Sequence, residues 1–424
     1  MNLREKGWFQ KYLLFRNKIN ISKDSEIPAL TESNKDFSLY RSIQPTGLMY
    51  GHPVLPSYIK DDKLKKLAVD ERMKIVFIES LLQFADYGMT DIQKSDYPDF
   101  SREFASSLTD YYLALYPELE GKATTFWGRK KEKEIIAEEI LDKRLYIKGS
   151  MLENLWVSFF HNSLLFLDVF YFRKWMEDKE KIATIDQLRK EKEALRFMLL
   201  QVIAAASYAD NEIERRERKL FNLFLKSADL DSKTIKKAKK LIDERLTVDD
   251  ITLPELDSWI IKKYILELAI LTVWADQEVA DDEKEFIQQL SKRLGFSQEE
   301  MDASMVAIES FVLTNWNDIQ FFLKNKDYKI VGTLLVKRIS KIAGINKDRI
   351  VTEIRESKEL MDLMTASVSR ELTVEEKEKV RVQLIDILKL LPTFMIIALP
   401  GTFLTLPIFF SVLPKSVLPS AFQE

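Results

Sequence analysis

Two stretches of the chain carry carboxylates at the same spacing. Residues 200–224 read LQVIAAASYADNEIERRERKLFNLF, residues 266–290 read LELAILTVWADQEVADDEKEFIQQL, and the two align without gaps at an offset of 66 residues. They share the pattern Ala-Asp-x-Glu-(Ile/Val)-x-x-x-Glu. Its acidic positions are Asp210, Glu212 and Glu217 in the first copy and Asp276, Glu278 and Glu283 in the second. Because divalent cations of the calcium and magnesium class prefer clustered carboxylate oxygens, these six residues are candidate metal ligands.

The elements around these carboxylates allow a second interpretation. Each copy reads as an apolar helix, a tight acidic turn and a second, amphipathic helix, and two copies predict a helical domain with approximate internal two-fold symmetry. Carboxylates at the start of a helix are also favoured by its exposed amides and its dipole, with no metal present. The turns are not EF-hands, since Arg215 and Asp281 stand where that loop requires glycine. The residues alone leave both interpretations open.

Residues that would support enzyme chemistry are scarce. The chain has no cysteine and only two histidines, His52 and His161, which argues against cysteine nucleophiles, histidine triads and multi-histidine zinc sites. The stretch GKATT, which begins at Gly121, is not a phosphate loop, because Tyr116 stands where the first glycine would be. We therefore predict that the protein is not an enzyme.

Composition sets the fold class and limits the partners. Of 424 residues, 46% are hydrophobic and 31% charged, enough apolar content for packed cores. Lys plus Arg is 64 and Asp plus Glu is 67, so nothing indicates direct DNA binding. Only 11 glycines are present, and periods near 3.6 residues dominate the apolar pattern, which predicts an all-α protein. No secretory signal peptide is expected at the N-terminus.

The expected organisation has five parts. They are a short helix with irregular chain over 1–62, a helical domain over 63–185, the repeat domain over 186–325, a helical connector over 326–389 and a membrane segment over 390–424. Within the second part, residues 151–172 are very apolar, but their uncharged run is too short to span a bilayer. We expect a buried helix there, with its polar residues satisfied in the core and a ligand or ion role as the alternative. Those residues are His161, Asn162 and Asp168.

The last segment has the length of a membrane span. Leu390 to Pro414 are 25 residues without a charge, whereas about 20 suffice to cross a bilayer as a helix. Prolines recur through it, which membrane helices tolerate better than water-facing ones, so a bent helix or a re-entrant hairpin is expected. They are Pro392, Pro400, Pro407 and Pro414, with Pro419 just beyond. Basic residues precede the segment, and the positive-inside rule therefore keeps the large N-terminal body in the cytoplasm.

Two family resemblances follow from these motifs. The two acidic copies resemble the tellurite-resistance TerB-like domain over about residues 190–320, which implies an all-helical domain that binds divalent cations through the acidic positions. Asn211 and Gln277 replace the glycine that often follows the aspartate in that family. The C-terminal part, about 370–424, resembles the membrane stretch of the leucine-zipper/EF-hand transmembrane (LETM) family. The matching residues are Leu372, Thr373, Glu376, Asp386, Leu391, Pro392, Pro400, Leu406, Pro407, Leu413, Pro414, Leu418, Pro419, Ser420 and Phe422.

The combination is similar to bacterial LETM-related, biofilm-associated proteins. The resemblance implies a protein of cation homeostasis in the bacterial inner membrane, through cation/proton exchange or its regulation. Asp386, just before the span, is the candidate for ion work, and a solvated interfacial charge is its alternative role. Expected partners are membrane lipid and a second copy or another membrane protein, with ribosome contact, known in the LETM family, as a minor alternative. A membrane-tethered scaffold or stress adaptor without transport is the other function that the sequence allows.

Overall fold

The computed structural model describes residues 2–18, 35–56, 58–59, 61–88, 97–117, 119, 131–146, 155–178, 182–207, 215–228, 230–254, 257–274, 281–315, 328–391, 394 and 412–413. Every regular element within these ranges is helical, which confirms the all-α fold class. The chain divides into two compact units. Unit 1 comprises Met1–Thr31 and Thr46–Asp257, and unit 2 comprises Glu32–Pro45 and Ser258–Glu424.

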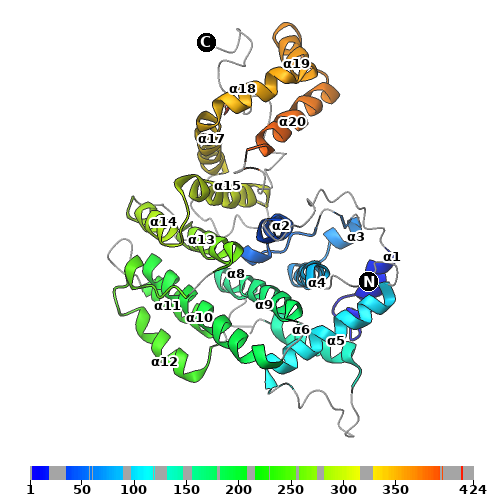
Figure 1. Cartoon of the computed structure of the whole chain (residues 1–424), viewed down its shortest axis with the longest axis vertical. Coiled ribbons are helices and arrows are strands. Elements are labelled where there is room, and N and C mark those ends of the chain that lie inside the picture. Colours follow the sequence, from blue (N-terminus) through cyan, green and yellow to red (C-terminus); the bar gives the residue numbers. More distant parts are fainter. Residues whose placement is uncertain are drawn as a thin grey trace. The chain divides into compact units, whose positions relative to one another are not determined.

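Unit 1 contains most helices of the first part of the chain (Figure 1), with the exception of α2. They are α1 (Trp8–Lys18), α3 (Asp62–Lys65), α4 (Val69–Gly88), α5 (Tyr97–Leu115), α6 (Lys133–Leu145), α8 (Leu155–Ser163), α9 (Leu165–Glu177), α10 (Ile182–Ala206), α11 (Arg215–Ser227) and α12 (Ser232–Leu241). Short 3-10 helices lie at Leu48–Tyr50 and Val248–Asp250. Apart from Lys174 and Glu177, every residue of α9 is buried, and this helix packs against α4, α5, α8 and α10. Helix α9 is therefore the centre of this unit.

The apolar stretch 151–172 is largely buried where it is described, as expected, but it does not form one helix. Helix α8 ends at Ser163 and α9 begins at Leu165, with Leu164 between them. The Ser163 hydroxyl donates a hydrogen bond of 2.8 Å to the carbonyl of Phe160 in the last turn of α8. Gly51 lies so close to this turn that a Cβ there would approach the Phe159 carbonyl oxygen to 1.9 Å. Contacts remote in sequence thus shape this break.

Unit 2 contains α2 (Lys35–Ile43), α13 (Trp259–Trp274), α14 (Asp281–Arg293), α15 (Gln298–Thr314), α17 (Tyr328–Ile345), α18 (Lys347–Glu356), α19 (Lys358–Ser369) and α20 (Val374–Lys389). Helix α15 is its central element, because all residues from Met301 to Leu313 are buried and the helix packs on α13, α14 and α17. Helix α2 packs on α13, where the Tyr40 hydroxyl donates a hydrogen bond of 2.5 Å to Glu267.

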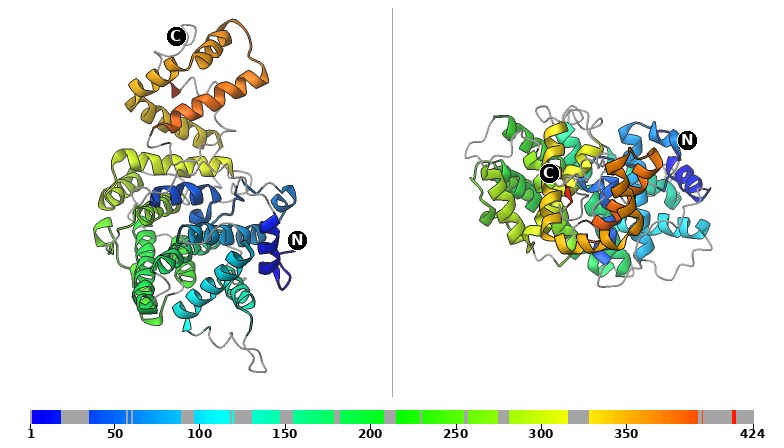
Figure 2. Two further views of the ribbon diagram at one scale, coloured as in Figure 1. Left: turned by 45° about the vertical axis from the view of Figure 1, so that its right-hand side comes forward. Right: turned by 90° about the horizontal axis from the view of Figure 1, so that it is seen from above.

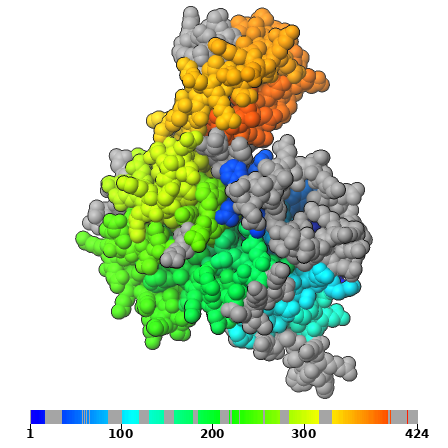
Figure 3. All heavy atoms as spheres, in the orientation of Figure 1, coloured from blue at the N-terminus to red at the C-terminus, as the bar shows by residue number. Residues whose placement is uncertain are grey.

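The last three helices of unit 2 form a small group of their own. Helices α18, α19 and α20 contact one another pairwise. The group is coloured amber to orange in Figures 2 and 3. Helix α20 begins with a capping box, in which the Thr373 hydroxyl accepts from the Glu376 amide and the Glu376 carboxylate accepts from the Thr373 amide. This gives Thr373 and Glu376, two residues of the LETM-like motif, a structural role.

The helices around the two acidic copies correspond to one another, α11 to α14 and α12 to α15. Helices α11 and α14 each have 13 residues, and both their starts and their ends are 66 positions apart. The next helices, α12 and α15, also begin at equivalent positions, where the side chains of Asp231 and Ser297 cap the first turn. Helices α10, α11 and α12 contact one another pairwise, and so do α13, α14 and α15. The first copy belongs to unit 1 and the second to unit 2, so a single symmetric domain over 186–325 stays a prediction, as do the other boundaries.

The described residues at both ends of the apolar C-terminal segment are largely buried. Leu391 and Phe394 are 0% exposed, Val412 is 4% exposed and Leu413 is 5% exposed, whereas Leu390 is 37% exposed. The prolines of this segment, from Pro392 to Pro419, lie outside the described residues. None of the helices that the structure describes has both the length and the apolar character that crossing a membrane requires.

Candidate functional site

The predicted metal ligands are not part of the described structure. Asp210, Glu212, Asp276 and Glu278 lie outside the described residues, and so do the side chains of Glu217 and Glu283, whose backbones lie in the first turns of α11 and α14. The described helices α11 and α14, in which these backbones lie, have 13 residues each. Elsewhere in the described ranges, no three acidic or histidine side chains are grouped so that they could hold a metal ion.

Asp386 lies in the last turn of α20. Its side chain is 61% exposed, and its Oδ1 is 3.3 Å from Nζ of Lys389. Exposed pairs of this kind contribute little stability. This exposed position is consistent with the alternative role of Asp386 as a solvated charge just before the apolar segment. An ion-handling role for Asp386 stays a prediction.

Asp168, whose side chain is fully buried, is the centre of a charge cluster in unit 1. Nε of Arg144 lies 2.7 Å from Oδ2, Lys192 bonds to Oδ1, and the Tyr112 hydroxyl donates to Oδ2 at 3.1 Å. A third cation, Arg196, lies 3.7 Å from Oδ1. Three helices other than α9 therefore direct polar groups at one carboxylate: α5, α6 and α10.

Burial and three nearby cations have opposite effects on the pKa values of the acidic groups in this cluster. Burial alone would raise the pKa of Asp168, but the charges of Arg144, Lys192 and Arg196 outweigh burial and hold the pKa well below its ordinary value. The same three cations outweigh burial at Tyr116 and lower the pKa of its phenol. Asp168 thus stays ionised and ties the surrounding helices to α9.

The neighbouring polar residues are satisfied by the protein. Nε2 of His161 lies 3.2 Å from the Arg144 carbonyl oxygen, and the Asn162 amide donates to the Gly51 carbonyl at 3.2 Å. These contacts support the structural interpretation of His161, Asn162 and Asp168 over a ligand role. They are the expected arrangement for buried polar groups.

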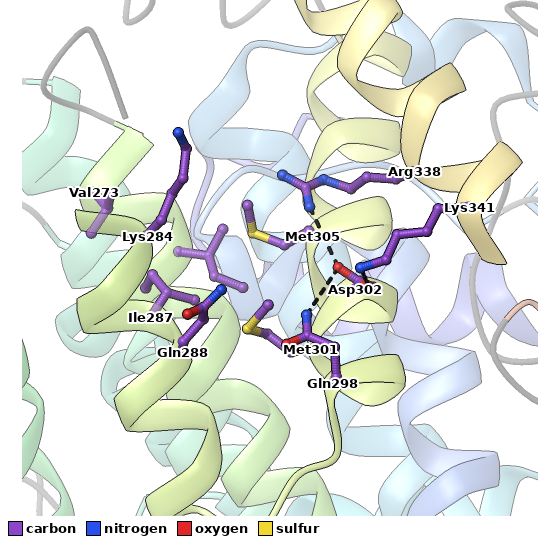
Figure 4. A pocket seen from close by; sticks show the side chains of 11 residues that line it. Val273, Lys284, Ile287, Gln288, Gln298, Met301, Asp302, Met305, Arg338 and Lys341 are labelled. Carbon is purple, nitrogen blue, oxygen red and sulfur yellow. Dashed lines mark hydrogen bonds and ion pairs between the residues drawn. The ribbon is translucent and has the colours of Figure 1, made fainter. Parts of the chain in front are cut away.

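A pocket of about 170 Å³ lies in unit 2 among α13, α14, α15 and α17 (Figure 4). Its apolar residues are at most 7% exposed; they are Ile270, Val273, Ile287, Met301 and Met305. Its polar residues are Lys284, Gln288, Gln298, Asp302, Arg338 and Lys341. An apolar interior with a few convergent polar groups is typical of a small-molecule site.

The polar wall of the pocket is organised by one carboxylate. Asp302 is buried, with Nζ of Lys341 at 2.6 Å from Oδ2, and with Arg338 at 3.6 Å and the Gln298 amide at 3.4 Å from Oδ1. Arg338 also donates to Glu309, two turns further along α15, at 2.8 Å. The cations of α17 are therefore held in place by the carboxylates of α15.

We did not expect this pocket from the sequence. A signal was present, because Asp302 and Glu309 are the only charged residues between Met301 and Leu313, and their spacing of seven places them on one helix face. Arg338 and Lys341 share one face of α17 in the same way. Which helix they would face depends on packing between segments distant in the chain.

Comparisons of the chain with protein-family models, with curated proteins and with solved structures found no match. The two family resemblances therefore rest on the motifs themselves.

Proposed function

We propose that this is a non-enzymatic, membrane-associated, LETM-like protein of cation homeostasis. Its acidic turns bind a divalent cation of the calcium or magnesium class, and its C-terminal segment associates with the bacterial inner membrane, with the body in the cytoplasm. The observation that carries the proposal is the repetition of α11 and α14 at equal length and equivalent positions. Selection for equivalent acidic turns would account for a repeat that keeps both its carboxylates and its helix bounds.

The C-terminal part supports the membrane role. Helix α20 is capped by Thr373 and Glu376, and it delivers the chain at Leu390 to the apolar segment. Its outer positions are charged, including Glu375, Glu378 and Asp386. A charged helix next to an uncharged stretch of 25 residues is the arrangement of a juxtamembrane element.

Cation binding is tested by calorimetry on the full chain. We expect saturable binding of Ca²⁺ or Mg²⁺ that is lost when Asp210, Glu212, Asp276 and Glu278 are replaced by their amides. The matched control replaces four exposed carboxylates elsewhere by amides: Asp186, Glu244, Asp348 and Glu356. Equal binding by the two variants would refute the proposed cation site.

Transport is tested separately in reconstituted vesicles. Cation flux that is lost in Asp386→Asn and retained in Glu375→Gln, on the same helix, would support exchange. An absence of flux in every oligomeric form would leave cation sensing without transport. Membrane attachment is tested by an alkaline carbonate wash, comparing the full chain with a truncation after Lys389.

A membrane-tethered scaffold or stress adaptor without transport is the second candidate, and the pocket of unit 2 favours it, because a pocket provides a place for recognition. It predicts that an unrelated membrane anchor can replace the segment after Lys389 with function retained. Loss of function on such a swap would count against the scaffold and in favour of a specific membrane role.

A further inference from the structure

We propose that the pocket of unit 2 binds a small amphiphilic carboxylate, with an apolar group of about six carbons on the Met301–Met305 side and the carboxylate at Lys341. This is a ligand site distinct from the acidic turns, and it does not depend on the proposed cation binding.

The apolar part of the site is built from three helices. Ile270 and Val273 come from α13, Ile287 comes from α14, and Met301 and Met305 come from adjacent turns of α15. Methionine side chains are flexible and polarisable, so they adapt to ligands of varied shape. An apolar group placed here would exchange water for contacts with side chains that are already buried.

The charge of the polar wall favours an anion. Lys284, Arg338 and Lys341 face the pocket together with a single carboxylate, Asp302. Figure 4 shows Lys284 on one side and Arg338 and Lys341 on the other. Asp302 is already offset by Lys341 and Arg338, and Arg338 is also committed to Glu309.

Lys341 is the cation best placed to meet a ligand. Its side chain is 53% exposed, and its ammonium group has three donors, one of which is directed to Asp302. A further donor can therefore reach a carboxylate at the pocket mouth without loss of the Asp302 contact. Gln288 on α14 and Gln298 on α15 supply neutral hydrogen-bonding groups in the pocket lining.

The volume limits the size of the ligand. The pocket measures about 170 Å³. An engineered apolar cavity of about 150 Å³ is known to hold benzene, so an apolar group of about six carbons fits here. For so few atoms we expect a dissociation constant of about 1 mM.

The experiment uses the full chain with 13C-labelled methionine methyl groups. The signals of Met301 and Met305 are assigned by replacing each with leucine. The probes are hexanoate, hexanol, hexylammonium and acetate. We expect saturable shifts of both signals with hexanoate, a weaker response to hexanol, and none with hexylammonium or acetate.

Variants separate the head-group contact from general apolar binding. In Lys341→Gln we expect hexanoate to bind about threefold more weakly, with hexanol binding unchanged. The control is Lys337→Gln, on the same helix and outside the pocket. If Lys341→Gln disturbs methionine signals throughout the protein, Lys284→Gln on the opposite wall replaces it.

Four results would overturn the proposal, and the first three concern the strength and selectivity of binding. They are an absence of saturable shifts up to about 20 mM hexanoate, twentyfold above the expected constant, equal binding of hexanoate and hexanol, and equal effects of Lys341→Gln and Lys337→Gln. Shifts confined to methionines other than Met301 and Met305 would also overturn it, because the ligand would then bind elsewhere.

Discussion

The carboxylate of Glu309, fully buried in α15, accepts a hydrogen bond of 2.8 Å from Nε of Arg338 in α17. The same guanidinium group lies 3.6 Å from Asp302. A buried carboxylate without a cationic partner is costly, so this arginine fixes the position of α17 on α15.

Replacing Arg338 with leucine should therefore destabilise unit 2 by about 3–5 kcal/mol, because two buried carboxylates lose their shared cation. Hydrogen exchange should show lower protection in α15 and α17. The double variant Arg338→Leu/Glu309→Leu should lose less, since the uncompensated charge of Glu309 is gone and Asp302 keeps its ion pair with Lys341. Arg349→Leu, at an exposed site of α18, is the control. Unchanged protection in Arg338→Leu would show that the pair does not hold these helices together.

In unit 1, replacing Asp168 with asparagine should cost about 3–5 kcal/mol of unfolding free energy. The cause is that the buried cations Lys192 and Arg196, and the partly buried Arg144, would lose their common anion. Chemical denaturation measures the change in unfolding free energy, and hydrogen exchange in α9 and α10 shows where protection is lost. Asp186→Asn, an exposed aspartate whose side chain is 74% accessible, is the matched control and should be nearly neutral.

The stability contributed by Asp168 should depend on pH in the acid range. Its pKa in the folded protein lies well below the value of about 3.9 expected in the unfolded chain. In the acid range the unfolded state therefore binds more protons, so this contribution is complete above about pH 5 and falls as pH decreases. The difference in unfolding free energy between the native chain and Asp168→Asn should shrink from about pH 5 to about pH 2. A difference that stays constant over this range would contradict the assignment.

Two glycines should respond oppositely to alanine. At Gly51, φ is +75° and a Cβ would approach the backbone of Phe159 to 1.9 Å, so Gly51→Ala should strongly destabilise unit 1. At Gly344, in the last turns of α17, a Cβ would meet nothing within 4 Å. Gly344→Ala should therefore stabilise its helix by about 0.5–1 kcal/mol. Thermal unfolding of both variants checks the pair, and equal effects would refute the proposed close approach.

The sequence predicted the helices well because their periodicity is local. The all-α class, the helices beside the acidic turns and the burial of α8 and α9 all followed from apolar spacing. The break at Leu164 did not, because no glycine or proline marks it. It accompanies the close approach of Gly51, which lies more than a hundred residues earlier, as the Asn162 hydrogen bond records.

Side-chain partners were much harder to predict than elements. His161, Asn162 and Asp168 were correctly expected to be satisfied within the core, but Arg144 and Lys192 could not be identified as the partners of Asp168, since each lies 24 residues away in opposite directions. The pocket was missed for the same reason. Its polar wall exists only once α17 packs on α15.

Helix α2 belongs to unit 2, although residues Thr46–Asp257 of unit 1 separate α2 from the other helices of unit 2 along the chain. Tyr40 and Glu267, which share a hydrogen bond, are 227 positions apart. During synthesis, α2 therefore cannot pack against α13 until unit 1 has been made, because α13 follows unit 1 in the chain. Such a contact of high sequence separation forms late and slowly. Completion of unit 2 should consequently be the slow event in the maturation of the nascent chain, and α2 should be exposed to chaperones and proteases in the interval.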